Sequence, residues 1–280
     1  MHNLDCLNMG QAKQKQYSKI EFLKIHQICC YCGEKATTID HCPPRSLFID
    51  RKWPESYEFP SCERCNSEGR KIENIIAVIY RIRLNTSVKD AHLGKLIMGL
   101  RNNSPEIIKE LESSNNGRWH RQELRKQYGD MGDDIYMRGY RVATIDGPKM
   151  REAMEYFGRK MGKALYYKHI GRRLKGKLFT KSMYINRNPE LLQIIANMTP
   201  MFATLQREFK NLSDQFTYRF NYNADLGIFC AIAGFKEQLG YLIMAMDEEF
   251  YKSLPPDTID GLNEIFDNEQ QKSLVPSVVS

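Results

Sequence analysis

The chain has 280 residues, of which 42% are hydrophobic, and it carries a formal net charge of +7. This length suits one large or two modest domains with an ordinary apolar core, which excludes a disordered chain. No apolar run approaches the roughly 20 residues that cross a bilayer, and residues 1–10 show no basic-then-apolar leader pattern. We therefore expect a cytoplasmic protein with no membrane partner, whose eight cysteines are thiols or metal ligands rather than disulfides.

The first predicted helix covers residues 11–27 and leads directly into the first of two cysteine pairs. Each pair has two residues between its cysteines, so that both thiolates of a tight turn can reach one ion. The four cysteines are Cys29, Cys32, Cys62 and Cys65. Zinc takes four such ligands in a closed tetrahedron, so the spacing predicts one structural zinc ion. Cys30 competes with the first of these cysteines, but only one residue would then separate the two ligands of that pair.

An Asp-His dipeptide lies between the cysteine pairs, and Asn66 directly follows the last cysteine. The carboxylate of Asp40 and the amide oxygen of Asn66 suit a hard divalent cation. The His41 imidazole titrates near neutral pH and can accept a proton from water. In an extended strand Asp40 and His41 point to opposite faces, and Pro43-Pro44 end the strand just after them. A second interpretation of His41 stays open, in which it is a spare zinc ligand or a structural histidine.

These motifs resemble the HNH (His-Asn-His) endonuclease family in its zinc-stapled form, over residues 20–75. The resemblance implies a ββα-metal fold, in which a hairpin carries the Asp-His dipeptide and a helix begins near the second cysteine pair. It also implies that Asp40 and Asn66 hold a catalytic magnesium or manganese ion. In such enzymes the histidine of the dipeptide, here His41, acts as the general base that activates water.

The segment around the dipeptide departs from that family in one place. Many members carry an asparagine about five residues before the third cysteine, where this chain has Tyr57. The resemblance therefore assigns no residue that orients the base. We expect residues 33–41 to form the short hairpin and residues 43–60 to form a loop rich in proline and aromatic residues. Arg45, four residues after the histidine, is a candidate phosphate contact and equally a candidate surface arginine.

Three further helices are predicted after the second cysteine pair. Isoleucines at spacings of three and four indicate a helix over residues 67–84, and weaker patterns indicate helices over residues 89–99 and 104–111. Ser113 to Gly117 is the clearest linker in the chain. We accordingly predict four parts: a nuclease module with the N-terminal helix, a helical connector, a basic α+β domain and an acidic tail. Their bounds are 1–85, 86–117, 118–268 and 269–280.

The second half begins with extended signals over residues 135–145 and a turn that leads into a helix with apolar positions from Met150 to Leu165. Residues 149–177 carry ten basic and two acidic side chains. This segment suits a nucleic-acid clamp and equally a solvated helix face. The basic residues chosen as nucleic-acid contacts are Lys160, Lys163, Arg172 and Arg173.

Three predicted strands follow, over residues 216–222, 228–233 and 241–246, with short connections typical of an antiparallel meander. Helices are predicted before them over residues 189–197 and 201–209. The fold class expected is therefore α+β, with a small zinc-stapled ββα-metal module joined by helices to a C-terminal α+β domain that has an antiparallel sheet.

The charge is unevenly spread along the chain. Residues 80–246 carry 28 basic and 16 acidic side chains, whereas residues 247–280 carry 2 and 8. A basic body suits a polyanion, because neutralising phosphates releases counterions, and we expect nucleic acid as the partner, above all double-stranded DNA. The acidic end has two candidate docking sites: the basic body of its own chain, or that of a second copy in a homodimer.

Two functions follow from these features. The first is a metal-dependent HNH endonuclease that hydrolyses phosphodiester bonds in DNA, with His41 as general base and with Asp40 and Asn66 holding the metal. The second is a catalytically inactive zinc-stapled module that binds nucleic acid or protein. The three residues together favour the first function, because a zinc staple needs none of them. The missing middle asparagine favours the second.

Overall fold

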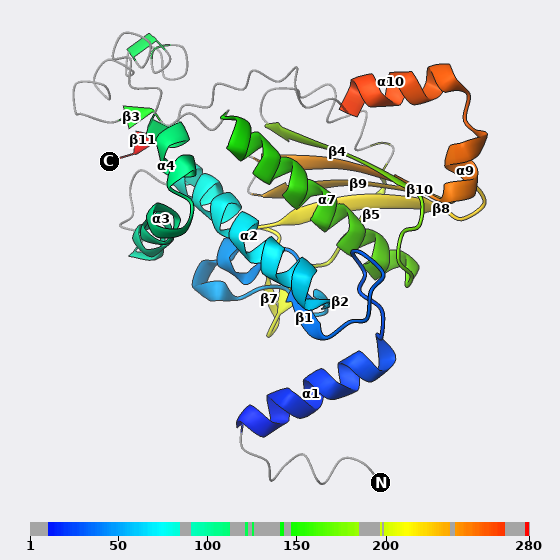
Figure 1. The fold of residues 1–280 in the computed structure, drawn as a ribbon, viewed down its shortest axis with the longest axis horizontal. Coiled ribbons are helices and arrows are strands. Elements are labelled where there is room, and N and C mark those ends of the chain that lie inside the picture. The colour runs from blue at the N-terminus through cyan, green and yellow to red at the C-terminus, as the bar shows by residue number, and fades with distance from the viewer. Residues whose placement is uncertain are drawn as a thin grey trace.

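The computed structural model describes ten stretches of the chain. They are residues 11–84, 91–112, 121–122, 125, 141–142, 147–184, 197, 199–235, 239–266 and 278–279. Helices dominate the first part of the chain and antiparallel strands the second, so the fold is α+β as predicted (Figure 1). No helix among the described residues is both long enough and apolar enough to cross a membrane.

A five-stranded antiparallel sheet forms the larger part of the structure. Its strands, in spatial order, are β4 (Lys177–Tyr184), β10 (Leu239–Met246), β9 (Ile228–Phe235), β8 (Thr217–Asn223) and β5 (Met201–Phe202). The predicted meander is confirmed, because β8, β9 and β10 are consecutive antiparallel neighbours. The sequence did not reveal β4, which follows directly on the basic helix and pairs along its whole length with β10.

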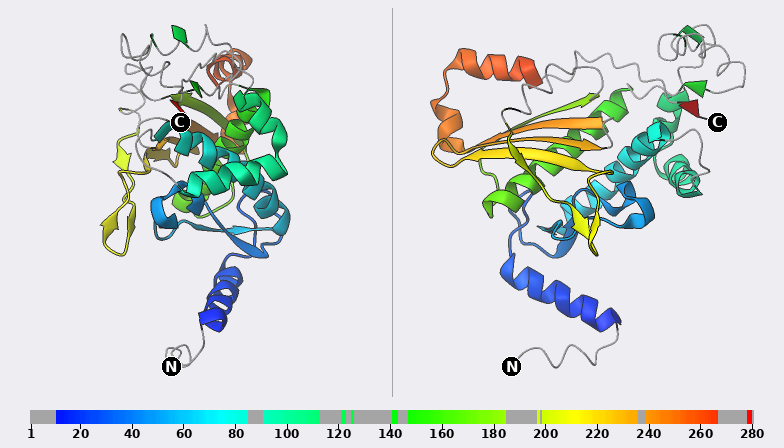
Figure 2. Two further views of the ribbon diagram at one scale, coloured as in Figure 1. Left: turned by 90° about the vertical axis from the view of Figure 1, so that its left-hand side faces the viewer. Right: turned by 180° about the vertical axis from the view of Figure 1, so that it is seen from behind.

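Helices cover both faces of this sheet (Figures 1 and 2). On one face lies α7 (Pro148–Ile170), whose Phe157 contacts Phe235 and Tyr241. Side chains alternate along a strand, so the neighbours of Tyr241 point to the other face. There α9 (Glu248–Ser253) and α10 (Pro256–Phe266) enclose a smaller apolar cluster around Phe179 and Phe266.

The long helix α2 (Glu63–Leu84) lies against α7 and joins the two halves of the molecule. Its residues Ile75 to Tyr80 are buried, as the isoleucine spacing predicts. Tyr80 contacts Phe235 of the sheet edge-on, and the same continuous core includes residues of the cysteine-rich segment. One apolar core therefore spans parts of the chain that the sequence assigns to separate domains. The predicted linker at 113–117 lies outside the described residues.

The cysteine-rich segment is built on a two-stranded antiparallel sheet of β1 (Thr38–His41) and β2 (Glu58–Ser61). The prediction that residues 33–41 form the hairpin is wrong, because β1 pairs across a long loop rather than with the residues before it. The prolines at 43 and 44 end β1, and the loop contains two short 3-10 helices, η1 (Arg45–Leu47) and η2 (Ile49–Arg51).

The remaining elements surround this framework. The predicted helices α1 (Gln11–Ile25), α3 (Ala91–Asn103) and α4 (Pro105–Glu112) are confirmed, and α1 projects away from the body (Figure 2). A two-stranded sheet pairs β3 (Arg141–Val142) with β11 (Val278–Val279). The other residues of the extended stretch 135–145, and nearly all of the helix predicted over 189–197, lie outside the described residues.

The helix predicted over residues 201–209 is wrong. After β5 the chain forms a projecting hairpin of β6 (Gln206–Arg207) and β7 (Lys210–Asn211), visible in Figure 2. Glu208 and Phe209 form its two-residue turn with φ values of 49° and 64°, which a helix cannot accommodate. The apolar residues of this segment have the spacing of a helix, but Leu205 and Leu212 are buried on either side of the hairpin.

Candidate metal centre and adjacent site

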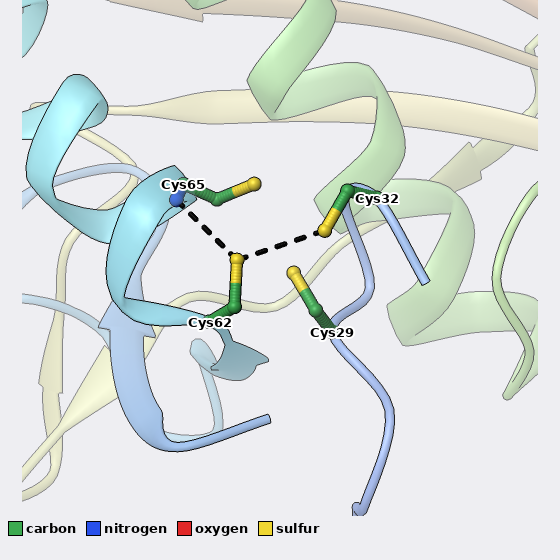
Figure 3. Close-up of side chains that lie close together, drawn as sticks. All are labelled: Cys29, Cys32, Cys62 and Cys65. Carbon is green, nitrogen blue, oxygen red and sulfur yellow. Dashed lines mark hydrogen bonds between the residues drawn. The ribbon is translucent and has the colours of Figure 1, made fainter. Parts of the chain in front are cut away.

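Four cysteine side chains converge at one end of the β1–β2 sheet (Figure 3). Two come from the turn after α1, one from the end of β2 and one from the first turn of α2. They are Cys29, Cys32, Cys62 and Cys65. Their sulfur atoms all lie within 4.8 Å of one another, and the Cys32 and Cys62 sulfurs are 3.6 Å apart. A zinc ion with Zn–S bonds of about 2.3 Å needs sulfurs about 3.8 Å apart, so the four residues can hold a metal ion such as zinc.

Local backbone structure prepares the first pair for metal binding. Burial opposes ionisation of Cys29, but hydrogen bonds from backbone groups of Cys32, Cys62 and Tyr31 outweigh it and lower the pKa of the Cys29 thiol to about 7. Thiolate is the form that binds zinc. The neighbouring Cys30 is fully buried and lies outside the four-sulfur group. Cys29 rather than Cys30 therefore belongs to the group that can hold a metal ion, as the spacing predicts.

The basic helix α7 holds the first cysteine turn in place. Lys163 donates from its ammonium to the Tyr31 carbonyl oxygen at 3.0 Å, and Arg173, just beyond the helix, donates to the Cys32 carbonyl oxygen at 3.3 Å. Arg172 forms a 2.6 Å ion pair with Asp247. These three residues were predicted to contact nucleic acid. Each has a partner within the protein instead of a wholly solvated charge.

Lys160 is the fourth predicted nucleic-acid contact, and its expected position on the surface is wrong. Its side chain is only 4% exposed, and its Nζ atom lies 2.9 Å from Asp40 Oδ2 and 2.5 Å from Glu73 Oε1. The Tyr31 hydroxyl donates to the same Asp40 oxygen at 2.6 Å. Burial opposes the charged ammonium, but the two carboxylates outweigh burial and raise the pKa of Lys160.

The backbone of α2 leaves room for this ammonium at Gly69. A Cβ atom at that position would overlap the Lys160 Nζ atom and approach Glu73. Three elements therefore meet at one buried cation: β1 supplies Asp40, α2 supplies Glu73 and α7 supplies Lys160. A buried charge costs free energy unless it is paired, and here one cation lies between two anions.

Asn66 lies close to this cluster but makes a different contact. It is buried, and its side-chain nitrogen donates to Thr38 Oγ1 at 2.8 Å. Thr38 and Asp40 share the inner face of β1, since alternate residues of a strand point the same way. The Asp40 Oδ2 atom already receives two donors, a hydroxyl and an ammonium. These residues as arranged fit an ammonium rather than the divalent ion expected from Asp40 and Asn66.

His41 lies on the other face of β1, apart from Asp40. Its Nε2 atom is 2.5 Å from Arg45 Nη2, and its ring meets the Trp53 ring edge-on with centroids 5.0 Å apart. The guanidinium groups of Arg45 and Arg207 both stack on the Trp53 ring, at 3.5 and 3.9 Å from its centroid. The hairpin β6–β7 thus supplies one of the two arginines beside the histidine.

The electrostatics of this face keep the imidazole neutral. Burial is the largest cause, and the Arg45 charge the next, of a fall in the pKa of His41 to about 4. A guanidinium can only donate, so His41 Nε2 accepts and the proton of the neutral ring lies on Nδ1. Among the described residues the Arg45 Nε atom is buried without a hydrogen-bond acceptor. This cluster therefore combines an imidazole lone pair with an unsatisfied cationic donor.

The chain matches no protein-family model, no curated protein and no solved structure in comparisons with each. The functional conclusion therefore depends on the site itself. Sequence reasoning missed three of its residues: Tyr31, Glu73 and Arg207. Trp53, next to Arg51-Lys52, did carry a signal, because an aromatic residue beside basic ones is typical of nucleic-acid contacts and equally of a small module's core. The others reach the site through tertiary packing.

A cavity of about 370 Å³ opens beside the cysteines, on the side where Lys160 lies. Its wall includes Arg64, Arg159 and Lys163, together with the carboxylate of Glu68. The exposed guanidinium of Arg64 forms a 2.9 Å ion pair with Glu34. The molecule thus has two basic surfaces near β1, this cavity and the arginine pair beside His41.

Proposed function

We propose that the chain is an endonuclease of the HNH type that hydrolyses phosphodiester bonds in DNA, with His41 as the general base. In this proposal β1, β2 and α2 form a ββα-metal module, and the four cysteines hold a structural zinc. The motif residues Asp40, His41 and Asn66 support the proposal from the sequence. The single structural observation that carries it is the contact of His41 with Arg45 beside a second arginine.

The arrangement around His41 suits an anionic phosphodiester. The guanidinium groups of Arg45 and Arg207 both lie over one indole ring, and guanidinium groups can donate two parallel hydrogen bonds to phosphate oxygens. The unsatisfied Nε donor of Arg45 favours a bound acceptor. A phosphate held by both arginines would draw the Arg45 Nη2 donor away from His41, which would free the Nε2 lone pair.

The hydrolytic step then balances without further groups. His41 Nε2 accepts a proton from water as the water oxygen forms a bond to phosphorus, and the phosphorus–oxygen bond to the leaving group breaks. The leaving oxygen takes a proton from solvent. Both guanidinium groups stabilise the negative charge that develops on the non-bridging oxygens. No step requires an ion at Asp40, whose carboxylate is held by Lys160 and Tyr31.

Cleavage of supercoiled plasmid DNA by the zinc-loaded chain tests this proposal. His41→Ala should slow cleavage by about 10²- to 10⁴-fold, as is typical when a general base is removed. Arg45→Gln should slow it as well. His26→Ala is a matched control, because its half-buried imidazole hydrogen-bonds Tyr167 far along the chain and plays no part in the step. Zinc content and circular dichroism should match the wild type in all three variants.

A specific observation favours the alternative function, an inactive module that binds nucleic acid. His41 is not among the residues that line the basic cavity beside the cysteines, and Asp40 is neutralised by an ion pair. The module would then bind DNA with a strong salt dependence and cut nothing. Absence of cleavage with intact binding would establish this alternative. Equal cleavage by the wild type and His41→Ala would place the base elsewhere.

A further inference from the structure

The cation between Asp40 and Glu73 occupies the place where an HNH-type site is expected to hold its divalent ion. The Lys160 ammonium lies within hydrogen-bond distance of both carboxylates, and its side chain is 4% exposed. A salt bridge on a surface exchanges readily with solvent, but this one is enclosed by β1, α2 and α7. The lysine is therefore a buried member of the cluster and not a solvent-exposed ion pair.

A divalent ion and this ammonium cannot share Asp40. Magnesium and manganese need about six oxygen ligands near 2.1 Å, and an ion at Asp40 would stand a few ångströms from a like charge in a site of low dielectric. The ammonium already lies against α2, in the space that a Cβ atom at position 69 would fill. Moving it out would also break the ion pairs with Asp40 and Glu73 and leave two buried carboxylates without their cation, which is costly.

The hydrogen-bond donors around Asp40 suit a lysine ammonium as its cation. Its Oδ2 atom accepts from the Tyr31 hydroxyl at 2.6 Å, a contact that orients the carboxylate toward Lys160. Lys160 Nζ also lies 5.4 Å from the centroid of the Tyr31 ring, within the range of a cation–π interaction. Within the described chain, only the four cysteines form a group of three or more histidine, cysteine or acidic residues that can hold a metal ion.

We propose that Lys160 is the resident cation of this site and takes the place of the catalytic divalent ion, so that the chain works without magnesium or manganese. This inference rests on the proposed function, because only an HNH-type site leads us to expect a metal at Asp40. Lys160 then acts as a positioning residue. It holds the Asp40 carboxylate and thereby fixes β1, the strand that carries His41 on its other face.

Titration of the zinc-loaded full-length chain with Mn²⁺, followed by electron paramagnetic resonance, tests the inference without any cleavage assay. The wild type should bind no Mn²⁺ at Asp40. Lys160→Ala removes the ammonium and leaves two carboxylates beside a space, so it should gain about one Mn²⁺ per chain. The further change Asp40→Asn should remove that gained site. Lys163→Ala is the matched control, because its ammonium contacts a carbonyl oxygen and no carboxylate.

The wild-type measurement alone can overturn the inference if Lys160→Ala does not fold. Bound Mn²⁺ in the wild type that is lost in Asp40→Asn would show that the lysine yields to a metal. A folded Lys160→Ala chain that binds no Mn²⁺ would show that the cluster is not a cation site. The Mn²⁺ result does not depend on DNA cleavage, so a failed nuclease assay counts only against the proposed function. Wild-type cleavage that requires added Mg²⁺ would count against the resident cation.

Discussion

Removal of one of the four cysteines should unfold the first cysteine turn, residues 29–36, and leave the large sheet folded. Cys62→Ser replaces a sulfur that lies 3.6 Å from the Cys32 sulfur in the four-cysteine group. Structural zinc contributes about 10–16 kcal/mol to folding in isolated zinc fingers. This is as large as the whole stability of an ordinary domain, about 5–15 kcal/mol. The first cysteine turn stays folded without zinc only if its remaining contacts contribute a comparable free energy.

The hydrogen bonds that hold this turn are individually weak by comparison. Lys163 and Arg173 hold two carbonyl oxygens of the turn, and the Cys30 amide donates to the Pro60 oxygen. Each such hydrogen bond contributes about 0.5–3 kcal/mol, so together they offset only part of the loss of zinc. The isoleucine face of α2, by contrast, stays buried against α7 and the sheet without any help from the metal. We expect the loss of structure to stop short of α2.

Zinc per chain by elemental analysis and amide hydrogen exchange by mass spectrometry measure the two parts of this prediction. Cys62→Ser should lose zinc and the exchange protection of the first cysteine turn, residues 29–36, whereas β9 and β10 keep theirs. Cys230→Ser is the matched control, because this half-buried cysteine lies in β9 and outside the metal group. Full zinc retention in Cys62→Ser, or loss of protection throughout the sheet, would refute the reasoning.

Two further predictions concern charge. His169 is stacked on Phe220, hydrogen-bonded to Tyr218, and its pKa is lowered to about 4, chiefly by burial. The unfolded chain therefore binds more protons between pH 6.5 and 4, so stability falls as pH falls through that window. His169→Phe should lose up to about 2 kcal/mol less than the wild type between pH 7.5 and 5 in urea unfolding, and an identical loss would contradict this. Arg45→Gln should reduce the salt slope of DNA binding by about one unit, whereas Arg172→Gln, which removes an arginine paired with Asp247, should leave it unchanged. Equal slopes in both variants would place the phosphate contacts elsewhere.

Elements with a strong period or fixed spacing were predictable from the sequence. The isoleucine stripe predicted α2, and the alternation of aromatic and polar residues around Tyr218 predicted β8. The cysteine spacing predicted which four side chains come together in a group that can hold a metal ion. Each of these signals lies within a short stretch of chain. Elements defined by a distant partner were not predictable in the same way. The pairing of β1 with β2, across a loop, depends on how residues 42–57 fold.

The interpretation of Lys160 failed for a physical reason. In a segment with ten basic residues, every lysine has the same sequence signature, and solvent exposure is the usual state of a lysine. What distinguishes this one is a pair of carboxylates on two other elements, one of them on a strand far earlier in the chain. The position of His41 shows the opposite case. Its separation from Asp40 follows from strand alternation alone, and the structure places the two residues on opposite faces as expected.

The close contact between Gly69 and the Lys160 ammonium has a consequence for comparisons among sequences. Because any side chain at position 69 would require the Lys160 ammonium to shift, the two positions should vary together during evolution. A relative that replaces the lysine with a small residue is free to carry alanine or serine at position 69. A relative that keeps the lysine should keep glycine there, along with acidic residues at positions 40 and 73. This pattern of joint substitution would distinguish relatives that share the lysine-centred cluster from those that lack it.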